Sequence, residues 1–286
     1  MEILHHANAI RQVVSAAKIS GRRVGLVPTM GALHEGHLSL VDAALAECDQ
    51  VAVSIFVNPT QFGPKEDLRK YPRPLDADIQ LLEDRGCDWV FTPSSEEIYP
   101  DGFATTLSVA GVAQPFEGAA RPGHFDGVAT VVLKLMNIVP AQSVYFGEKD
   151  YQQSLVIRQL VRDLNLDLKL RVCPIIREPD GLAMSSRNFY LSPPEREQAL
   201  ALSKSLEAAV VAYDQGERDV EVISRKIEQI LDDAGVKTEY ATLVSEGTVD
   251  PVKTISGPTR ALVAARVGQT RLIDNRLLAA RSNGPA

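Results

Sequence analysis

Short apolar runs alternate with amphipathic segments along the first 175 or so residues. Residues 51–57 form a continuous, mostly β-branched run, which is typical of a parallel strand buried on both faces. Leu38, Val41 and Leu45 recur at the spacing of one helix face, so a helix is expected to begin near Gly36 or His37. The complete pattern predicts strands over 23–27, 51–57, 89–91, 144–146 and 168–172, and further helices over 76–85, 128–138 and 151–164.

This alternation of strands and helices predicts an α/β fold, a Rossmann-like parallel sheet joined by right-handed crossovers. From about residue 176 the pattern changes to two helices, 193–213 and 219–234, and the chain then forms short strands near 240–244, 260–265 and 270–274. We therefore expect a smaller α+β C-terminal domain, so that the chain divides into residues 1–175 and 176–286. A hinge is expected near 176–178, and the tail 281–286 is expected to be disordered.

Composition and charge narrow the classes of partner. The chain has 286 residues, 45% of them hydrophobic, which is ample for a core without disulfides or a structural metal. Its formal charge of −7 argues against a general surface for nucleic acid or anionic membrane. Three widely spaced cysteines and no apolar leader or long apolar run favour a cytoplasmic protein with neither a signal peptide nor a membrane span.

The most informative segment is Pro28–His37, PTMGALHEGH, where a strand ends in a glycine-bearing loop and a helix begins. A helix N-terminus offers unpaired N–H groups and the positive end of its dipole, which suit a phosphate. His34 and His37, one turn apart, would add donors to the same phosphate. Two other interpretations are capping histidines and a metal pair, although no third metal ligand lies near in sequence.

Three further segments follow predicted strands or the domain boundary. Gly147–Asp150, GEKD, can offer a lysine to a phosphate and a carboxylate to a ribose, or it can be an ordinary solvated turn. Pro179–Asn188, PDGLAMSSRN, carries two hydroxyls and a guanidinium suited to phosphate, or it is an interdomain linker. Asn58–Arg73 places the amides of Asn58 and Gln61 just after a buried strand, where they can bind a hydroxyl-bearing acid or merely stabilise a turn.

Five segments occur in a fixed order: PTMGALHEGH, FVNPTQFG, YPR, FGEKDYQQ and GLAMSSRN. The early HxGH and the late Met-Ser-Ser-Arg resemble the HIGH and KMSKS elements of a nucleotidyltransferase superfamily that includes class I aminoacyl-tRNA synthetases. The whole set is more similar to the pantothenate synthetase (pantoate–β-alanine ligase) family, densely over about residues 20–195 and loosely beyond. This resemblance implies an ATP-dependent ligase that condenses pantoate with β-alanine through a pantoyl-adenylate and releases AMP and pyrophosphate.

The resemblance also implies roles for individual residues. His37 would be catalytic, with His34, Lys149 and Arg187 as further donors to the transition state. It implies that residues 1–175 bind nucleotide and pantoate, that residues 176–286 form a lid, and that the enzyme is a homodimer requiring Mg²⁺, with Asp78 as a candidate to position the ion. Pantoate and β-alanine would contact Gln61, Gln153 and Asn58. The ATP site would comprise Met30, Gly31, Ala32, Leu33, His34, Glu35, Gly36, His37, Gly147, Glu148, Lys149, Asp150, Ile176, Met184, Ser185, Ser186 and Arg187.

Other functions compatible with these motifs remain open at this point. A related nucleotidyltransferase would act on another small acid or on a phosphate and would stop after nucleotide transfer. A non-catalytic nucleotide-binding module would not need so many converging histidine, lysine and arginine side chains. A tRNA synthetase is disfavoured by the size and the acidic charge of the chain.

Overall fold

The computed structural model describes residues 1–64 and 66–278, and it divides the chain into two compact units, Met1–Ile176 and Arg177–Ala286. The expected disordered tail, 281–286, lies outside the described residues. None of the helices in the described part is both long and apolar enough to cross a bilayer.

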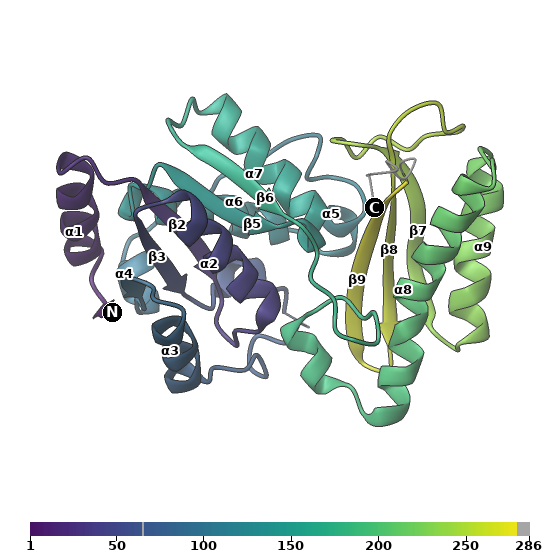
Figure 1. Ribbon diagram of the computed structural model, residues 1–286, viewed down its shortest axis with the longest axis horizontal. Helices are drawn as coiled ribbons and strands as arrows, with labels where there is room; N and C mark the ends of the chain where they lie inside the picture. The colour runs from purple at the N-terminus through teal and green to yellow at the C-terminus, as the bar shows by residue number, and fades with distance from the viewer. Residues whose placement is uncertain (65, 279–286) are drawn as a thin grey trace. The chain divides into compact units, whose positions relative to one another are not determined.

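The first unit contains a six-stranded parallel sheet in the order β1-β4-β3-β2-β5-β6 (Figure 1). This arrangement confirms the predicted α/β class. The strands are β1 (Glu2–Leu4), β2 (Val24–Thr29), β3 (Gln50–Ile55), β4 (Trp89–Phe91), β5 (Ser143–Gly147) and β6 (Lys169–Cys173). The helices are α1 (Ala7–Ile19), α2 (Glu35–Glu47), α3 (Leu75–Asp84), α4 (Ser95–Ile98), α5 (Glu117–Ala120), α6 (His124–Ile138) and α7 (Tyr151–Asp163), with short 3-10 turns η1 (Pro59–Gln61) and η2 (Glu148–Asp150).

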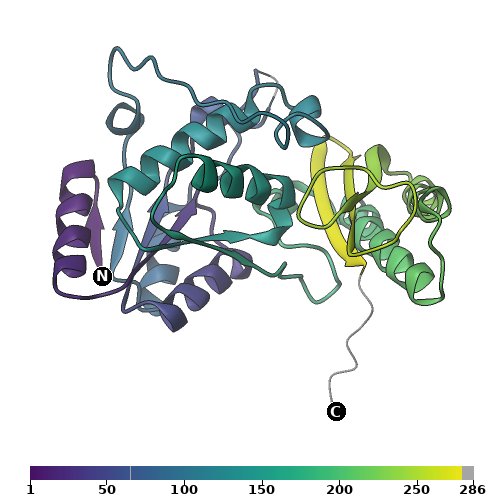
Figure 2. The ribbon, with the colours of Figure 1, turned by 90° about the horizontal axis from the view of Figure 1, so that it is seen from above.

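Alternate residues of the central strands face two separate cores, so helices cover both faces of the sheet (Figure 2). On β2, Leu26 packs in the core that contains α1, α6 and α7. Its neighbour Val27 packs in the core that contains α2 and α3. Because both faces are buried, these strands read as continuous apolar runs, which explains why they were predictable from the sequence.

The sequence pattern missed β1, α1, α4 and α5. α1 buries Ile10, Val14 and Ala17 at helical spacing, and its other side chains are half-buried or exposed. β1, α4 and α5 have three or four residues each, which is too short for a periodicity to emerge. β1 exists because it pairs with β4, a contact between segments far apart in the chain.

The second unit is α+β, as predicted, and contains an antiparallel sheet β7-β8-β9 and two long helices (Figure 1). α8 (Pro193–Asp214) begins with a capping box between Ser192 and Glu195. A short 3-10 turn, η3 (Ser186–Tyr190), precedes it, and α9 (Val220–Asp233) follows. The strands β7 (Lys237–Ser245), β8 (Thr259–Val267) and β9 (Thr270–Leu278) are longer than expected, because their polar ends continue the pairing beyond the apolar cores that were recognised.

Candidate active site

The loop after β2 makes a tight left-handed turn at the C-terminal edge of the sheet. Gly31 has φ +81° and Ala32 has φ 50°, and the Gly31 N–H donates to Thr29 Oγ1 at 3.2 Å. A Cβ on Gly31 would lie 2.9 Å from Asp78 Oδ2 and 3.0 Å from Ile55 Cγ2. Glycine is therefore required here both by the backbone angle and by the space available.

The carboxylate of Asp78, which lies on α3, anchors this loop through hydrogen bonds to its backbone. Asp78 is 2% exposed, and it accepts hydrogen bonds from the Ala32 N–H at 2.8 Å and the Leu33 N–H at 2.7 Å. Burial raises the pKa of the carboxyl, and the two backbone hydrogen bonds partly oppose that rise. Each of its oxygens accepts one backbone N–H, so Asp78 fixes the shape of the loop. Its expected part in positioning magnesium stays a prediction.

Replacing Asp78 with asparagine should loosen the loop, because the asparagine NH₂ would face a backbone N–H that has lost its acceptor. We expect the free energy of unfolding to fall by about 1–3 kcal/mol. Denaturant unfolding measures the effect. Asp76→Asn, an exposed change in the same first turn of α3, serves as the control. Identical stability in both variants would contradict the anchoring role.

The histidine pair lies at the start of α2, which begins at Glu35, one residue before the predicted start. His34 is the N-cap, and its Nδ1 accepts from the Gly36 N–H at 3.1 Å. The capping interpretation therefore holds for His34. The rings of His34 and His37 lie with their centroids 4.1 Å apart and their planes tilted by 37°, so the two imidazoles are in close contact at the helix N-terminus.

His37 is the less committed of the two imidazoles. Its Nδ1 is buried and has no hydrogen-bond partner among the described residues. Burial is the largest cause that lowers the pKa of His37 to about 3, followed by the neighbouring His34, with a smaller lowering by Lys149 and an opposing effect of Asp150. His37 is therefore neutral at physiological pH, and its buried Nδ1 makes no hydrogen bond within the described residues.

Lys149 and Asp150 lie in η2, between β5 and α7. Lys149 Nζ is 3.8 Å from Asp150 Oδ1, and the lysine side chain is 20% exposed. Because β5 pairs with β2 in the sheet, the loops that follow the two strands emerge at the same edge. The mutual electrostatic effect of His37, Lys149 and Asp150 shows that the GEKD and HEGH segments meet there.

The amides of Asn58 and Gln61 are both buried and bond to each other. Asn58 is 1% exposed, and its Nδ2 donates to Gln61 Oε1 and to the Gly127 carbonyl. Its Oδ1 accepts from Thr60 and from the Tyr99 hydroxyl. Asn58 thus orients Gln61, and its predicted ligand contact stays a prediction. Gln61 Nε2 donates to Met30 Sδ at 3.0 Å, which links this pair to the loop after β2.

Sequence reasoning missed the polar groups that support this region from α6 and α7. Gln152 is buried, and its amide bonds the Val112 and Pro115 carbonyls and the Glu117 N–H. Gln153 is half-buried in the first turn of α7. His124 is also buried, and no motif contains it. A histidine directly after the Arg-Pro-Gly turn, at the start of an apolar helix, was the available signal.

Two buried histidines should make the fold sensitive to acid. The pKa of His124 is lowered to about 4 by burial and by Arg121, against opposing effects of the Gln61 carbonyl, Glu66 and Glu117. Both His124 and His37 are thus neutral in the folded protein, whereas unfolded histidines bind protons below about pH 6.5. The unfolded state binds more protons in this window, so stability is full above about pH 6.5 and is lost as the pH falls towards 4.

We expect each of these two histidines to lower the free energy of unfolding by up to about 1.4 kcal/mol per pH unit in this window. Denaturant unfolding at several pH values measures the slope. His124→Asn removes one titrating group and should reduce the slope relative to the unchanged protein. An equal slope in both proteins would show that His124 is protonated in the fold or titrates normally.

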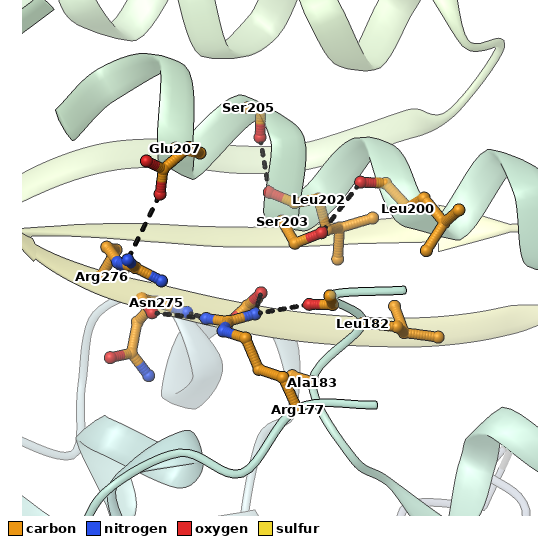
Figure 3. A network of polar contacts seen from close by, with 12 residues as sticks. Arg177, Leu182, Ala183, Leu200, Leu202, Ser203, Ser205, Glu207, Asn275 and Arg276 are labelled. Atoms are coloured by element: carbon orange, nitrogen blue, oxygen red, sulfur yellow. Dashed lines mark hydrogen bonds and ion pairs between the residues drawn. The ribbon is translucent and has the colours of Figure 1, made fainter. Parts of the chain in front are cut away.

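The Met-Ser-Ser-Arg segment belongs to the second unit. Ser185 caps η3 by accepting from the Arg187 N–H at 3.2 Å, and Ser186 is buried. The turn before the segment is anchored by Arg177, which makes a two-pronged ion pair with Asp274 on β9 at 2.7 and 2.9 Å and also bonds the Gly181 carbonyl. Figure 3 shows Arg177 reaching the Asn275 carbonyl on the same strand.

The base of this segment is further tied to α8. Asn188 donates to Glu178 at 2.7 Å and to the Ala183 carbonyl at 3.0 Å, and Arg196 of α8 pairs with Glu178 and Asp180. These bonds stabilise the turn that carries Met184, Ser185, Ser186 and Arg187. Ile176, the remaining predicted ATP contact, is the last residue of the first unit.

A Rossmann-like parallel sheet with a histidine pair and a lysine at its C-terminal edge defines the class of nucleotide-binding α/β proteins. The chain matches the pantoate-beta-alanine ligase family over residues 2–277. It is 54% identical to the pantothenate synthetase of Acidobacterium capsulatum, covering 90% of this chain and 86% of the relative. It is 50% identical to that of Pelobacter propionicus, covering 97% and 98%.

Solved structures agree with the sequence relatives. The pantothenate synthetase of Thermus thermophilus superposes with a TM-score of 0.92 at 44% identity, covering 96% of this chain and 99% of that one. The pantoate-beta-alanine ligase of Francisella tularensis, complexed with beta-gamma ATP and beta-alanine, superposes with a TM-score of 0.82 at 38% identity, covering 100% of both chains. The chain therefore belongs to the pantoate–β-alanine ligase family, as its motifs indicated.

Proposed function

We propose that the chain, an ATP-dependent ligase that condenses pantoate with β-alanine, works in two steps through a pantoyl-adenylate. In the first step a pantoate carboxylate oxygen attacks the α-phosphorus of ATP, and pyrophosphate leaves. In the second step the β-alanine amine attacks the acyl carbon, and AMP leaves as the amide forms and the amine loses a proton. Both steps require positioning and charge stabilisation more than covalent participation of the protein.

The observation that carries this proposal is the neutral, buried imidazole of His37 beside Lys149. A neutral ring can donate one hydrogen bond to a phosphate oxygen, and Lys149 adds a positive charge where the leaving group accumulates negative charge. No thiol nucleophile is needed, and burial raises the pKa of Cys87 to about 12, which keeps that thiol protonated. The site therefore suits direct attack by the substrate carboxylate.

The remaining assignments divide between the substrates. For ATP we propose residues 30–37, 147–150, Ile176 and 184–187, with Arg187 as a further phosphate donor. For pantoate we propose Gln61 and Gln153, with Gln61 also near β-alanine, while Asn58 acts through Gln61. The lid role of residues 176–286 stays a prediction from the family resemblance, as do the homodimer and the cytoplasmic location.

The described residues do not provide a metal cage. No group of three or more His, Cys, Asp or Glu side chains in residues 1–64 and 66–278 is arranged to hold a metal ion, and both oxygens of Asp78 accept backbone hydrogen bonds. Mg²⁺ commonly binds substrate phosphates and water with few protein ligands. We therefore propose that Mg²⁺ enters with ATP, and Asp78 stays the candidate to help position it.

One incubation tests the reaction sequence. The protein is supplied with ATP, pantoate and Mg²⁺, with and without β-alanine, and pyrophosphate, AMP and the amide product are measured. An adenylate route predicts pyrophosphate formation of about one equivalent per site without β-alanine, and sustained release of AMP and pantothenate only when β-alanine is added. A nucleotidyltransferase that acts on a different acid or a phosphate would form no pyrophosphate with pantoate. Pyrophosphate formation that requires β-alanine from the first turnover would contradict a separate adenylation step.

A further inference from the structure

A chain of buried polar contacts leads from the surface to the backbone of Gln61. Arg121 forms a two-pronged ion pair with Glu66, with Nε–Oε1 at 2.7 Å and Nη2–Oε2 at 2.9 Å. The third nitrogen of the guanidinium, Nη1, lies 2.9 Å from His124 Nε2. The other ring nitrogen of His124, Nδ1, lies 2.8 Å from the Gln61 carbonyl oxygen. These four residues therefore form one continuous network within the first unit.

The chemistry of the two end groups determines the tautomer of His124. A guanidinium can only donate, so Nε2 of the ring must accept from Arg121. A carbonyl oxygen can only accept, so Nδ1 must carry the proton and donate to Gln61. The ring is consequently neutral, in agreement with its lowered pKa. A protonated imidazole would place an N–H against the guanidinium and break the network.

Close packing around Gln61 restricts its position in addition to these hydrogen bonds. α6, which begins at His124, lies so close to η1 that a Cβ on Gly127 would be 2.5 Å from the Thr60 oxygen and 2.7 Å from the Gln61 Cα. The Gly127 carbonyl also accepts from Asn58, which in turn orients the Gln61 amide. The first turn of α6 thus controls both the backbone and the side chain of Gln61.

We propose that His124 is a positioning residue for pantoate. It fixes Gln61 by donating a hydrogen bond to the Gln61 carbonyl oxygen, and Arg121, which is paired with Glu66, selects the His124 tautomer that can donate this bond. The inference rests on the proposed function, in which Gln61 binds pantoate. His124 itself does not contact the substrate. The network should therefore affect pantoate binding and the adenylation step, and it should leave ATP binding unchanged.

Two substitutions of His124 test the roles of its two ring nitrogens separately. The side-chain nitrogen of asparagine can take the place of Nδ1, and that of glutamine can take the place of Nε2. We expect His124→Asn to keep the KM for pantoate within about threefold of the unchanged protein, and His124→Gln to raise it roughly tenfold, the scale of one lost buried hydrogen bond. Pantoate-dependent pyrophosphate release without β-alanine is the readout, and the KM for ATP and the thermal midpoint are measured in parallel.

Thr130→Val is the matched control for general damage to α6. Thr130 is buried on the same helix and accepts from the Leu107 N–H at 2.9 Å, a contact unrelated to Gln61. This variant should lose stability without a change in the KM for pantoate. If Thr130→Val raises that KM as much as His124→Gln does, the effect of His124 is general to the helix and the proposal is wrong.

A double-mutant cycle tests whether His124 acts through Gln61. Gln61→Ala should itself raise the KM for pantoate, and His124→Gln should add little in the Gln61→Ala background. Additive effects would overturn the proposal, and so would an increase in the KM for β-alanine alone, which would indicate direct contact with the amine substrate. Histidine ¹⁵N chemical shifts supply an independent readout, in which a neutral His124 protonated at Nε2 would also refute it. Absence of pantoate-dependent pyrophosphate in the unchanged protein would instead refute the proposed function.

Discussion

Replacing His37 with alanine is expected to lower the rate of adenylation by about 10²- to 10³-fold, the scale of one lost transition-state donor. His37 is neutral and its Nδ1 is buried without a partner among the described residues, so we expect it to contribute a hydrogen bond rather than a charge. Its removal leaves no buried ion behind, and the fold should persist. A single-turnover measurement of pyrophosphate release, with ATP and pantoate saturating, isolates the chemical step from product release.

The control for His37→Ala is another histidine whose loss should not affect adenylation. His6 lies at the start of α1, where its exposed ring pairs with Glu97 at 3.1 Å. His6→Ala should leave the single-turnover rate unchanged. If His37→Ala retains the full rate, His37 takes no part in the chemistry, and the open imidazole is a structural feature of the helix start.

Replacing Lys149 with alanine is expected to have an effect of similar size, about 10²-fold or more, on the same step. The ammonium lies at the C-terminal edge of the sheet, where it influences the His37 ring, and it is the positive charge nearest to that ring in η2. Its carboxylate partner, Asp150, is half exposed. Loss of the lysine therefore leaves no buried charge without a partner, and the free energy of unfolding should change little.

Lys169→Ala, an exposed change on β6, is the control for the loss of one positive charge. Comparison of thermal midpoints and single-turnover rates then separates catalysis from folding. A large drop in the midpoint of Lys149→Ala, accompanied by a normal rate per folded molecule, would assign Lys149 to structure. A low rate with an unchanged midpoint supports the catalytic assignment.

Three of the motifs could be placed from the sequence because each is a local pattern that follows a buried strand. The strands β2, β3 and β5 are apolar on both faces, so their ends were readable and the segments after them could be placed at one edge of the sheet. The ends of these strands are enough to bring His34, His37, Lys149 and Gln61 to one edge. The burial of Gln152 could not be predicted, because the exact start of α7 decides which side chain points into the core.

The supporting contacts could not be predicted, because their two ends are far apart in the chain. Asp78 bonds the Ala32 amide across 46 positions, and His124 bonds the Gln61 carbonyl across 63. From the sequence alone, Asp78 was an acidic residue near a phosphate site and therefore a candidate for magnesium. Only the packing of α3 against the loop after β2 shows that its oxygens are engaged by backbone amides.

The amino-acid sequence by itself determined the α/β class, the two-part organisation and the family, because apolar periodicity and the five motifs are properties of neighbouring residues. The tertiary structure alone decided which polar groups are buried and which hydrogen bonds hold them in place. Burial and hydrogen-bond partners depend on elements brought together by the sheet. The same residue type therefore serves as a helix cap at position 34, carries an unpartnered buried nitrogen at 37 and donates to a distant backbone carbonyl at 124.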